Sequence, residues 1–165
     1  MNGKINVALI YGSTREGRFC DTVASWAGTQ IASRGEFAPD VIDPAALTLP
    51  ARHEREDSVE LAALQHRIGQ ADAFVVVTPE YNHGYPAALK FLIDSFYDEW
   101  QAKPVAFVSY GGISANVWAQ FDAAGELLKP AHANKSMATM LAQLHWWAIA
   151  LRDARHAVPY GQAAA

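Results

Sequence analysis

The chain has 165 residues, of which 51% are apolar and 18% charged, and its formal net charge is -4. This composition excludes a disordered chain or a polyelectrolyte tail and predicts one globular domain with a substantial core. The first apolar run has only the length of a strand and leads straight to Arg15, which fits neither a secretory signal nor a membrane span, so we expect a cytoplasmic protein that does not bind membranes.

Short runs of β-branched residues alternate with longer amphipathic stretches along the chain, a pattern typical of a parallel sheet covered by helices. The pattern predicts an open α/β sheet of four strands in one domain over residues 1–158, followed by a loose tail over 159–165. Strands are expected at residues 5–11, 37–42, 73–78 and 105–109. Helices are expected at residues 19–33, 58–69, 87–100 and 131–155.

The loop after the first strand is basic in a chain that is acidic as a whole. It offers the hydroxyls of Ser13 and Thr14, the guanidinium groups of Arg15 and Arg18, and the N–H groups of a helix start. Strand, short basic loop and helix together favour a phosphate site, with two solvated arginines as the alternative. The single cysteine, Cys20, cannot form an internal disulfide; it either has a pKa lowered by the loop or simply packs the helix start.

Two more loops follow strands that should end at the same edge of the sheet. Residues 79–86 follow the third strand and carry two prolines, a glycine and two tyrosines, whereas Gly111 and Gly112 follow the fourth. Ligands of open parallel sheets sit where such loops meet, although each loop could also be mere turn chemistry. Backbone groups and aromatic faces favour a flat polar heterocycle, and no histidine or cysteine spacing indicates a metal.

These residues resemble the NAD(P)H-dependent FMN reductases, which have a flavodoxin-like fold and include quinone, azo-dye and chromate reductases. Residues 12–18 are similar to the family's Gly-Ser-x-Arg phosphate loop, and residues 79–90 are similar to its flavin-ring loop and the helix that follows. The resemblance implies FMN as cofactor, NADPH or NADH as reductant, and assembly as a dimer. It implies that FMN is bound by Ser13, Thr14, Arg15, Arg18, Phe19, Cys20, Pro79, Glu80, Tyr81, Asn82, Gly84, Gly111 and Gly112.

The chain departs from the family after the fourth strand. No later run of β-branched residues is long enough for a buried strand, and residues 122–125 are typical of a turn. We therefore expect the crossover helix and the fifth strand to be shortened or missing, which leaves an apolar edge for a partner subunit or the terminal helix to cover. The alternative alignment makes residues 115–128 a short crossover helix, with an irregular edge segment near Ser136.

Several side chains have an ordinary explanation beside a functional one. Glu80 is expected to anchor its loop, and His83 faces either solvent or the flavin and its acceptor. Lys90 and Asp94 have the spacing of an exposed helical pair. The adjacent Trp146 and Trp147 cannot both lie at the centre of one helical stripe, so one is a candidate for an interface. We assign no catalytic side chain.

The leading hypothesis is an FMN-dependent oxidoreductase that passes hydride from NAD(P)H through bound FMN to free flavin, a quinone or a nitro compound, since the cofactor carries the reactive atom. The alternatives are a flavin-binding protein or degenerate scaffold without turnover, and an electron-transfer flavodoxin. The loops lack the motifs of P-loop nucleotidases and of dinucleotide-binding Rossmann folds, and the acidic strand ends of receiver domains. No basic stripe indicates nucleic-acid binding.

Overall fold

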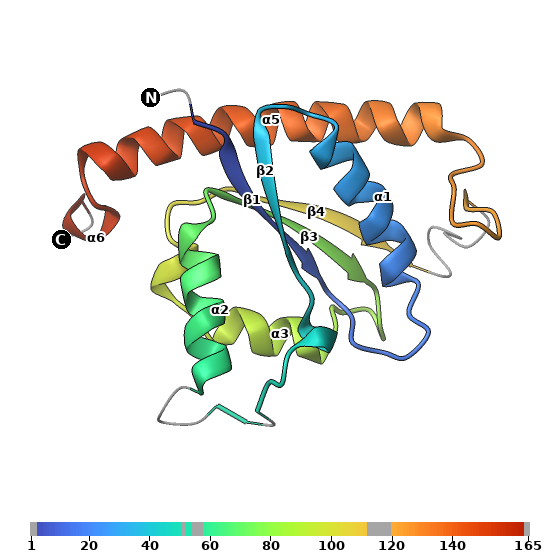
Figure 1. Cartoon of the computed structure of the whole chain (residues 1–165), viewed down its shortest axis with the longest axis horizontal. Helices are drawn as coiled ribbons and strands as arrows, with labels where there is room; N and C mark the ends of the chain where they lie inside the picture. Colours follow the sequence, from blue (N-terminus) through green and yellow to red (C-terminus); the bar gives the residue numbers. More distant parts are fainter. Residues whose placement is uncertain (1–2, 51, 54–57, 112–119, 164–165) are drawn as a thin grey trace.

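A computed structural model describes residues 3–50, 52–53, 58–111 and 120–163 of the chain. Its centre is a parallel sheet in the order β2-β1-β3-β4, formed by β1 (Ile5–Tyr11), β2 (Phe37–Ile42), β3 (Ala73–Pro79) and β4 (Val105–Tyr110) (Figure 1). All four predicted strands and their parallel arrangement are confirmed. Of the polar residues 52–57, which separate the second strand from the next helix in sequence, only residues 52 and 53 are described.

Helices cover both faces of the sheet because successive side chains of a strand point to opposite faces. Val75 and Val77 of β3 lie in one core with α1 (Cys20–Ala32) and α5 (Pro130–Ala157). Phe74 and Val76 lie in the other core with α2 (Val59–Gln70) and α3 (Ala87–Asp94). β3 is buried along its whole length, as expected of a central strand with two covered faces.

The helix after β3 is shorter than predicted. The sequence predicts a helix over residues 87–100, but α3 ends at Asp94 and a separate 3-10 turn, η2, spans Asp98–Trp100. The Ser95 hydroxyl donates to the Phe91 carbonyl at 2.7 Å, and the Trp100 indole N–H donates to the Ile93 carbonyl at 3.1 Å. These side chains satisfy the last carbonyls of α3 and end it, an effect that apolar spacing does not reveal.

The segment between β4 and α5 is an irregular hairpin where it is described. Phe121 and Leu127 form an antiparallel bridge around a turn at residues 122–125, in which the Asp122 carboxylate accepts N–H bonds from Ala124 at 2.8 Å and Glu126 at 2.9 Å. The predicted turn is thus confirmed. The alternative alignment is wrong where it can be checked, because residues 121–128 are not helical and α5 already begins at Pro130, before the proposed edge segment. Residues 112–119 lie outside the description.

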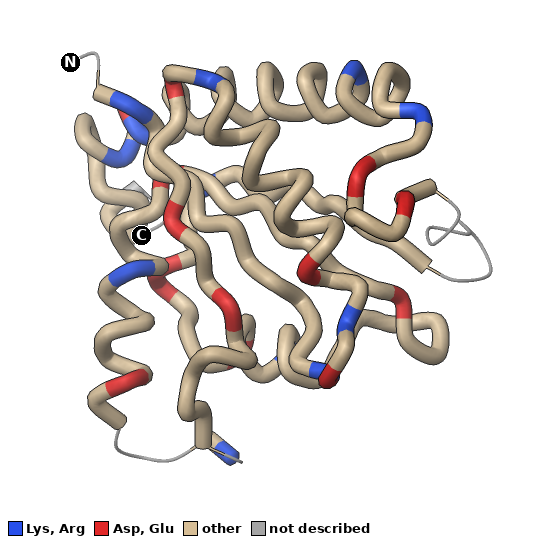
Figure 2. Tube along the Cα trace, turned by 45° about the vertical axis from the view of Figure 1, so that its right-hand side comes forward, with Lys and Arg blue, Asp and Glu red and all other residues tan. Residues whose placement is uncertain are grey.

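Within the described ranges, no helix is both long enough and apolar enough to cross a membrane. Basic and acidic residues are interspersed along the trace and do not gather on one element (Figure 2). Lys90 and Asp94 form the predicted exposed ion pair on α3. The last described element is a short helix, α6 (Tyr160–Ala163).

Candidate functional site

The loop after β1 is drawn tightly against β3. The Gly12 N–H donates to the Val77 carbonyl at 2.7 Å. A Cβ atom at Gly12 would lie 2.7 Å from that same carbonyl oxygen and 3.0 Å from Thr78 Cα, a distance real side chains do not adopt. Glycine is therefore required here by close backbone approach, and it fixes where the loop leaves the sheet.

The first and third strand loops meet, as predicted. The buried Ser13 places its Oγ 2.8 Å from the Tyr81 hydroxyl and accepts the Arg15 N–H at 3.4 Å. The Arg15 guanidinium carbon lies 3.6 Å from the centre of the Tyr81 ring, a cation–π contact. Because Ser13 and Tyr81 are 68 positions apart, one small set of contacts joins two loops at the carboxyl edge of the sheet. Thr14 and Arg15 remain exposed there.

Arg18 is held by protein partners. Its guanidinium donates to both Asp43 carboxylate oxygens, at 2.7 and 2.5 Å, to Asp21 at 2.8 Å and to the Ser13 carbonyl. Only 8% of the side chain is exposed. The hydrogen bonds that Arg18 donates to Asp43 raise the pKa of Arg18 further above its usual value. Arg18 thus clamps the first loop to the residue that follows β2, whereas the family resemblance implies a direct contact between Arg18 and the FMN phosphate.

Asp43 is the residue of this site that the sequence analysis missed. Burial opposes its ionisation, but the hydrogen bonds from Arg18 and from the Ala45 N–H outweigh that effect and lower the pKa of Asp43. The same carboxylate caps η1 (Pro44–Ala46) through the Ala45 N–H at 3.0 Å. Its position directly after β2, at the same sheet edge as the other loops, was the available signal.

The third-strand loop forms a tight two-residue turn. Tyr81 and Gly84 exchange backbone hydrogen bonds of 2.8 and 3.0 Å, and the turn residues Asn82 and His83 have positive φ angles of 51° and 62°. Positive φ at both central residues is the geometry of a type I′ turn, which asparagine tolerates well. His83 is 97% exposed and its Nδ1 lies 3.2 Å from a Glu80 carboxylate oxygen, which confirms the solvent-facing interpretation of the histidine.

The fourth strand completes the same edge. The Glu80 N–H donates to the Tyr110 carbonyl at 2.9 Å, which links the third and fourth loops. Phe19 packs edge-on against Tyr110 and Phe121, with ring centres 6.3 and 5.4 Å apart. Gly111 is buried at the end of β4, and Gly112 lies outside the described residues.

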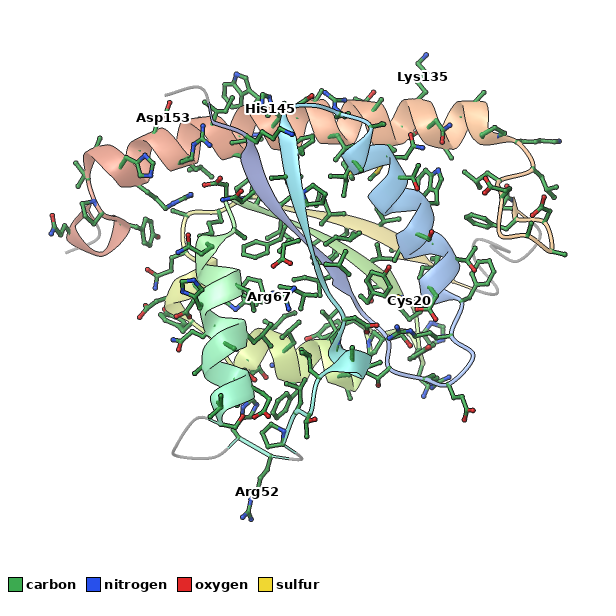
Figure 3. The ribbon with its side chains drawn as sticks, viewed as in Figure 1. Cys20, Arg52, Arg67, Lys135, His145 and Asp153 are labelled. Atoms are coloured by element: carbon green, nitrogen blue, oxygen red, sulfur yellow. The ribbon has the colours of Figure 1, made fainter. Side chains whose placement is uncertain are left out.

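Cys20 packs the start of α1, where Figure 3 labels it. Its side chain is fully buried and its Sγ lies 3.7 Å from the Val77 carbonyl oxygen. Burial raises the pKa of Cys20, so the suggestion of a pKa lowered by the basic loop is wrong and the packing interpretation is confirmed. Only the backbone of Cys20 can face a ligand. α1 has no side-chain cap, so its first N–H groups open toward the loop.

The chemistry of this edge suits an anionic ligand with a planar ring. An uncapped helix start, the exposed Thr14 and Arg15, and a turn presenting backbone polar groups lie next to one another. In the described part of the chain, no three His, Cys, Asp or Glu side chains are grouped to hold a metal ion.

The chain is similar to known reductases. Residues 5–144 match the family described as NADPH-dependent FMN reductase. The chain is 36% identical over 115 residues to an NAD(P)H-dependent FMN reductase of Schizosaccharomyces pombe and 34% identical over 126 residues to one of Saccharomyces cerevisiae. The matches cover 64% and 66% of this chain and 58% and 66% of those relatives, so this chain spans less than two thirds of their length.

The fold has a close counterpart among solved structures. The flavoenzyme NAD(P)H:(acceptor) oxidoreductase FerB from Paracoccus denitrificans superposes with a TM-score of 0.64 at 19% identity. That alignment covers 87% of this chain and 97% of the other. The likeness shows the predicted flavodoxin-like architecture.

Proposed function

Because the chain belongs to the NADPH-dependent FMN reductase family, we propose that it is an oxidoreductase that passes hydride from NAD(P)H, through bound FMN, to a small acceptor such as free flavin, a quinone or a nitro compound. When bound, FMN supplies the hydride-accepting and hydride-donating chemistry, and the protein supplies position and electrostatics. The observation that carries the proposal is the junction of the first and third strand loops through Ser13, Arg15 and Tyr81.

The residues of the edge fit FMN in two parts. We propose that Thr14, Arg15 and the first backbone N–H groups of α1 bind the phosphate, because they are exposed or uncapped and carry the required donors. Arg18 acts on the phosphate through the loop it clamps, since Asp43 already takes its donors.

The second part of the edge, the loop after β3, is the proposed site of the flavin ring. We propose that the ring lies against the loop formed by Pro79, Glu80, Tyr81, Asn82 and Gly84, with Gly111 on its far side. Gly112, which the resemblance also assigns to the flavin, lies outside the described residues. Pro79 is buried at the end of β3, whereas the turn beyond it is exposed and its backbone is fixed by the paired Tyr81 and Gly84 bonds. A fixed backbone orients hydrogen-bonding groups without a loss of entropy on binding.

FMN titration of the purified protein tests this proposal. Replacing Arg15 with alanine removes a charge-assisted contact of roughly 1.5–3 kcal/mol, which weakens FMN binding by about 10- to 150-fold. Arg34→Ala is the matched control, because Arg34 pairs with Glu36 between α1 and β2, beyond the carboxyl end of α1, and should leave FMN affinity unchanged. A protein that is colourless and binds no added FMN would refute the proposal; equal effects of both variants would place the phosphate elsewhere.

A second candidate function is flavin binding without turnover. It is favoured by one observation: within the described residues the sheet ends at β4, and no crossover helix or fifth strand follows. NAD(P)H oxidation measured with the FMN-loaded protein and a quinone separates the candidates. Steady consumption of NAD(P)H supports the reductase, whereas unchanged absorbance at 340 nm under saturating FMN supports a binding protein.

The location and assembly of the protein are a separate proposal. We propose a cytoplasmic homo-oligomer, most simply a dimer. The single cysteine is a buried free thiol, which suits a reducing compartment. The two exposed tryptophans of α5 and the apolar edge of β4 support self-association.

A further inference from the structure

A polar hollow of about 330 Å³ lies at the amino edge of the sheet, where the parallel strands begin. The residues that precede β1, β3 and β4 meet the last turns of α5 there (Figure 1). In Figure 3, Asp153 of α5 marks this end of the sheet and Cys20 marks the opposite end, where the candidate flavin site lies. The titratable side chains that line the hollow are Lys4, Asp72, Lys103, Arg152, Arg155 and the exposed His156.

The hollow holds far more positive than negative charge. Four of its lining side chains are cationic and only one, Asp72, is a carboxylate. The cations come from the segment before β1, the segment before β4 and the end of α5, so the sequence shows no basic run. With His156 neutral, the lining has an excess of three positive charges in a chain whose formal net charge is -4. Such a concentration of one sign of charge attracts an oppositely charged ligand.

The single carboxylate does not neutralise its neighbours. Asp72 is shared between two arginines, with one oxygen 3.3 Å from Arg155 Nη2 and the other 3.6 Å from Arg152 Nη1. Lys103 forms no ion pair within the described part of the chain, and its Nζ donates instead to two carbonyls near the end of α2, at 3.1 and 2.8 Å. Elsewhere Arg67 has a carboxylate of its own, Asp40, at 2.7 Å. The amino-edge cations are therefore short of negative charge.

These cations are also partly withdrawn from water. The side chains of Arg152 and Arg155 are only 14% and 18% exposed. Burial, together with the charge of Arg155, lowers the pKa of Lys103 to about 8, and the carboxylates of Asp72 and Glu99 offset this only in part. Burial also lowers the pKa of Arg155. Half-buried cations that repel one another are stabilised when an anion binds among them.

Both guanidinium groups are held in place and still have donors to offer. Arg152 Nη1 donates to the carbonyls of the two residues before β1, at 3.5 and 3.2 Å, while its Nε and Nη2 have no hydrogen-bond partner among the described residues. Arg155 donates through Nη1 to the Ala102 carbonyl at 2.5 Å and through Nη2 to Asp72 at 3.3 Å, which leaves its Nε. An oxyanion with several acceptor oxygens matches such a set of fixed donors.

We propose that this hollow binds a phosphate dianion, either free phosphate or the phosphate group of a small molecule. Lys103, Arg152 and Arg155 donate to its oxygens, since guanidinium and ammonium groups are the usual partners of phosphate in proteins. The cations surround one concave site instead of forming a stripe, which suits a small anion and not a nucleic acid. This site is separate from the proposed flavin site, because the two lie at opposite ends of the sheet.

Chemical modification of Lys103 in the unaltered protein tests the site. Acetylation by an N-hydroxysuccinimide ester at neutral pH is followed by peptide mass spectrometry, with and without inorganic phosphate, and chloride keeps the ionic strength equal. Bound phosphate shields Lys103 and raises its pKa, so we expect its acetylation to slow by at least about 5-fold. Lys90, which is exposed and paired with Asp94 on α3, is the internal control and should react at the same rate in both. An unchanged rate at Lys103 would overturn the proposal.

Calorimetric titration with inorganic phosphate measures the contribution of Lys103 to binding. The Arg15→Ala variant is the background, because it removes an exposed cation of the proposed FMN phosphate site. In that background Lys103→Gln should weaken phosphate binding at least about 10-fold, the loss expected for one charge-assisted hydrogen bond, and Lys103→Arg should restore most of the affinity. Arg67→Gln is the matched control, since Arg67 is paired with Asp40, and should leave phosphate binding unchanged.

A second titration distinguishes the two sources of phosphate. Tighter binding of a phosphate monoester, glycerol 3-phosphate, than of inorganic phosphate supports the site and identifies a small-molecule ligand, whereas equal or weaker binding supports the site and identifies free phosphate. Phosphate binding that Lys103→Gln leaves at full strength, in a variant shown to be folded by circular dichroism, would overturn the proposal. A protein that binds no FMN but protects Lys103 with phosphate would refute the proposed function and leave this inference standing.

Discussion

The hydrogen bond between Ser13 and Tyr81 offers a direct test of how the site is assembled. The bond joins two loops over 2.8 Å, and Ser13 is fully buried. Removing the bond should therefore lower the free energy of unfolding. A net contribution of about 0.5–1.5 kcal/mol to the free energy of unfolding is expected for such a bond. The Arg15 N–H still reaches Ser13 Oγ after Tyr81→Phe, which places the expected value near the middle of that range.

A double-mutant cycle measures this contribution. Urea unfolding of Ser13→Ala, Tyr81→Phe and the double variant should give a coupling free energy of about 1 kcal/mol. Ser25→Ala combined with Tyr81→Phe is the control, since Ser25 lies exposed on α1 and its carbonyl binds Thr29. Coupling below about 0.3 kcal/mol, within the scatter of independent sites, would refute the claim that this bond joins the loops.

Three further predictions concern the same edge. Gly12→Ala should destabilise the fold by about 1–3 kcal/mol in urea unfolding, because its Cβ would meet a β3 carbonyl at 2.7 Å, whereas Gly35→Ala, with nothing within 4 Å, should not. Asp43→Asn should lose roughly 1.5–3 kcal/mol at neutral pH. Because folding lowers the pKa of Asp43 beside Arg18, that stability is present above the unfolded pKa of about 3.9 and is lost as pH falls through the folded pKa; a stability difference that stays constant from pH 6 to pH 2 would contradict it. Cys20 should react with a thiol reagent at least about 100-fold more slowly in the folded protein than in urea, since it is buried and its pKa is raised.

The four strands were predictable because a buried parallel strand leaves a continuous apolar signal. Residues 73–78 form such a run, and every residue of β3 is buried. The end of α3 was not predictable in the same way, because its apolar spacing continues to Trp100 while Ser95 and the Trp100 indole take the last carbonyls. Whether a side chain caps a helix depends on a rotamer and a tertiary contact, and periodicity carries neither.

The candidate site was also predictable only in part. Convergence of the loops follows from topology, since parallel strands end at one edge, and Ser13 and Tyr81 meet there. Which cation stays exposed does not follow, because Arg15 and Arg18 are equivalent as sequence. The structure separates them through Asp43, which lies in the loop after β2. Its carboxylate binds the guanidinium of Arg18, whereas the guanidinium of Arg15 lies over the Tyr81 ring.

The edge strand shows the one place where local sequence and overall architecture conflict. The alternation at Val105 and Phe107 is typical of a strand that has a covering helix and a neighbouring strand on each side. Among the described residues, no helix covers these two side chains and no strand lies on the side of β4 away from β3.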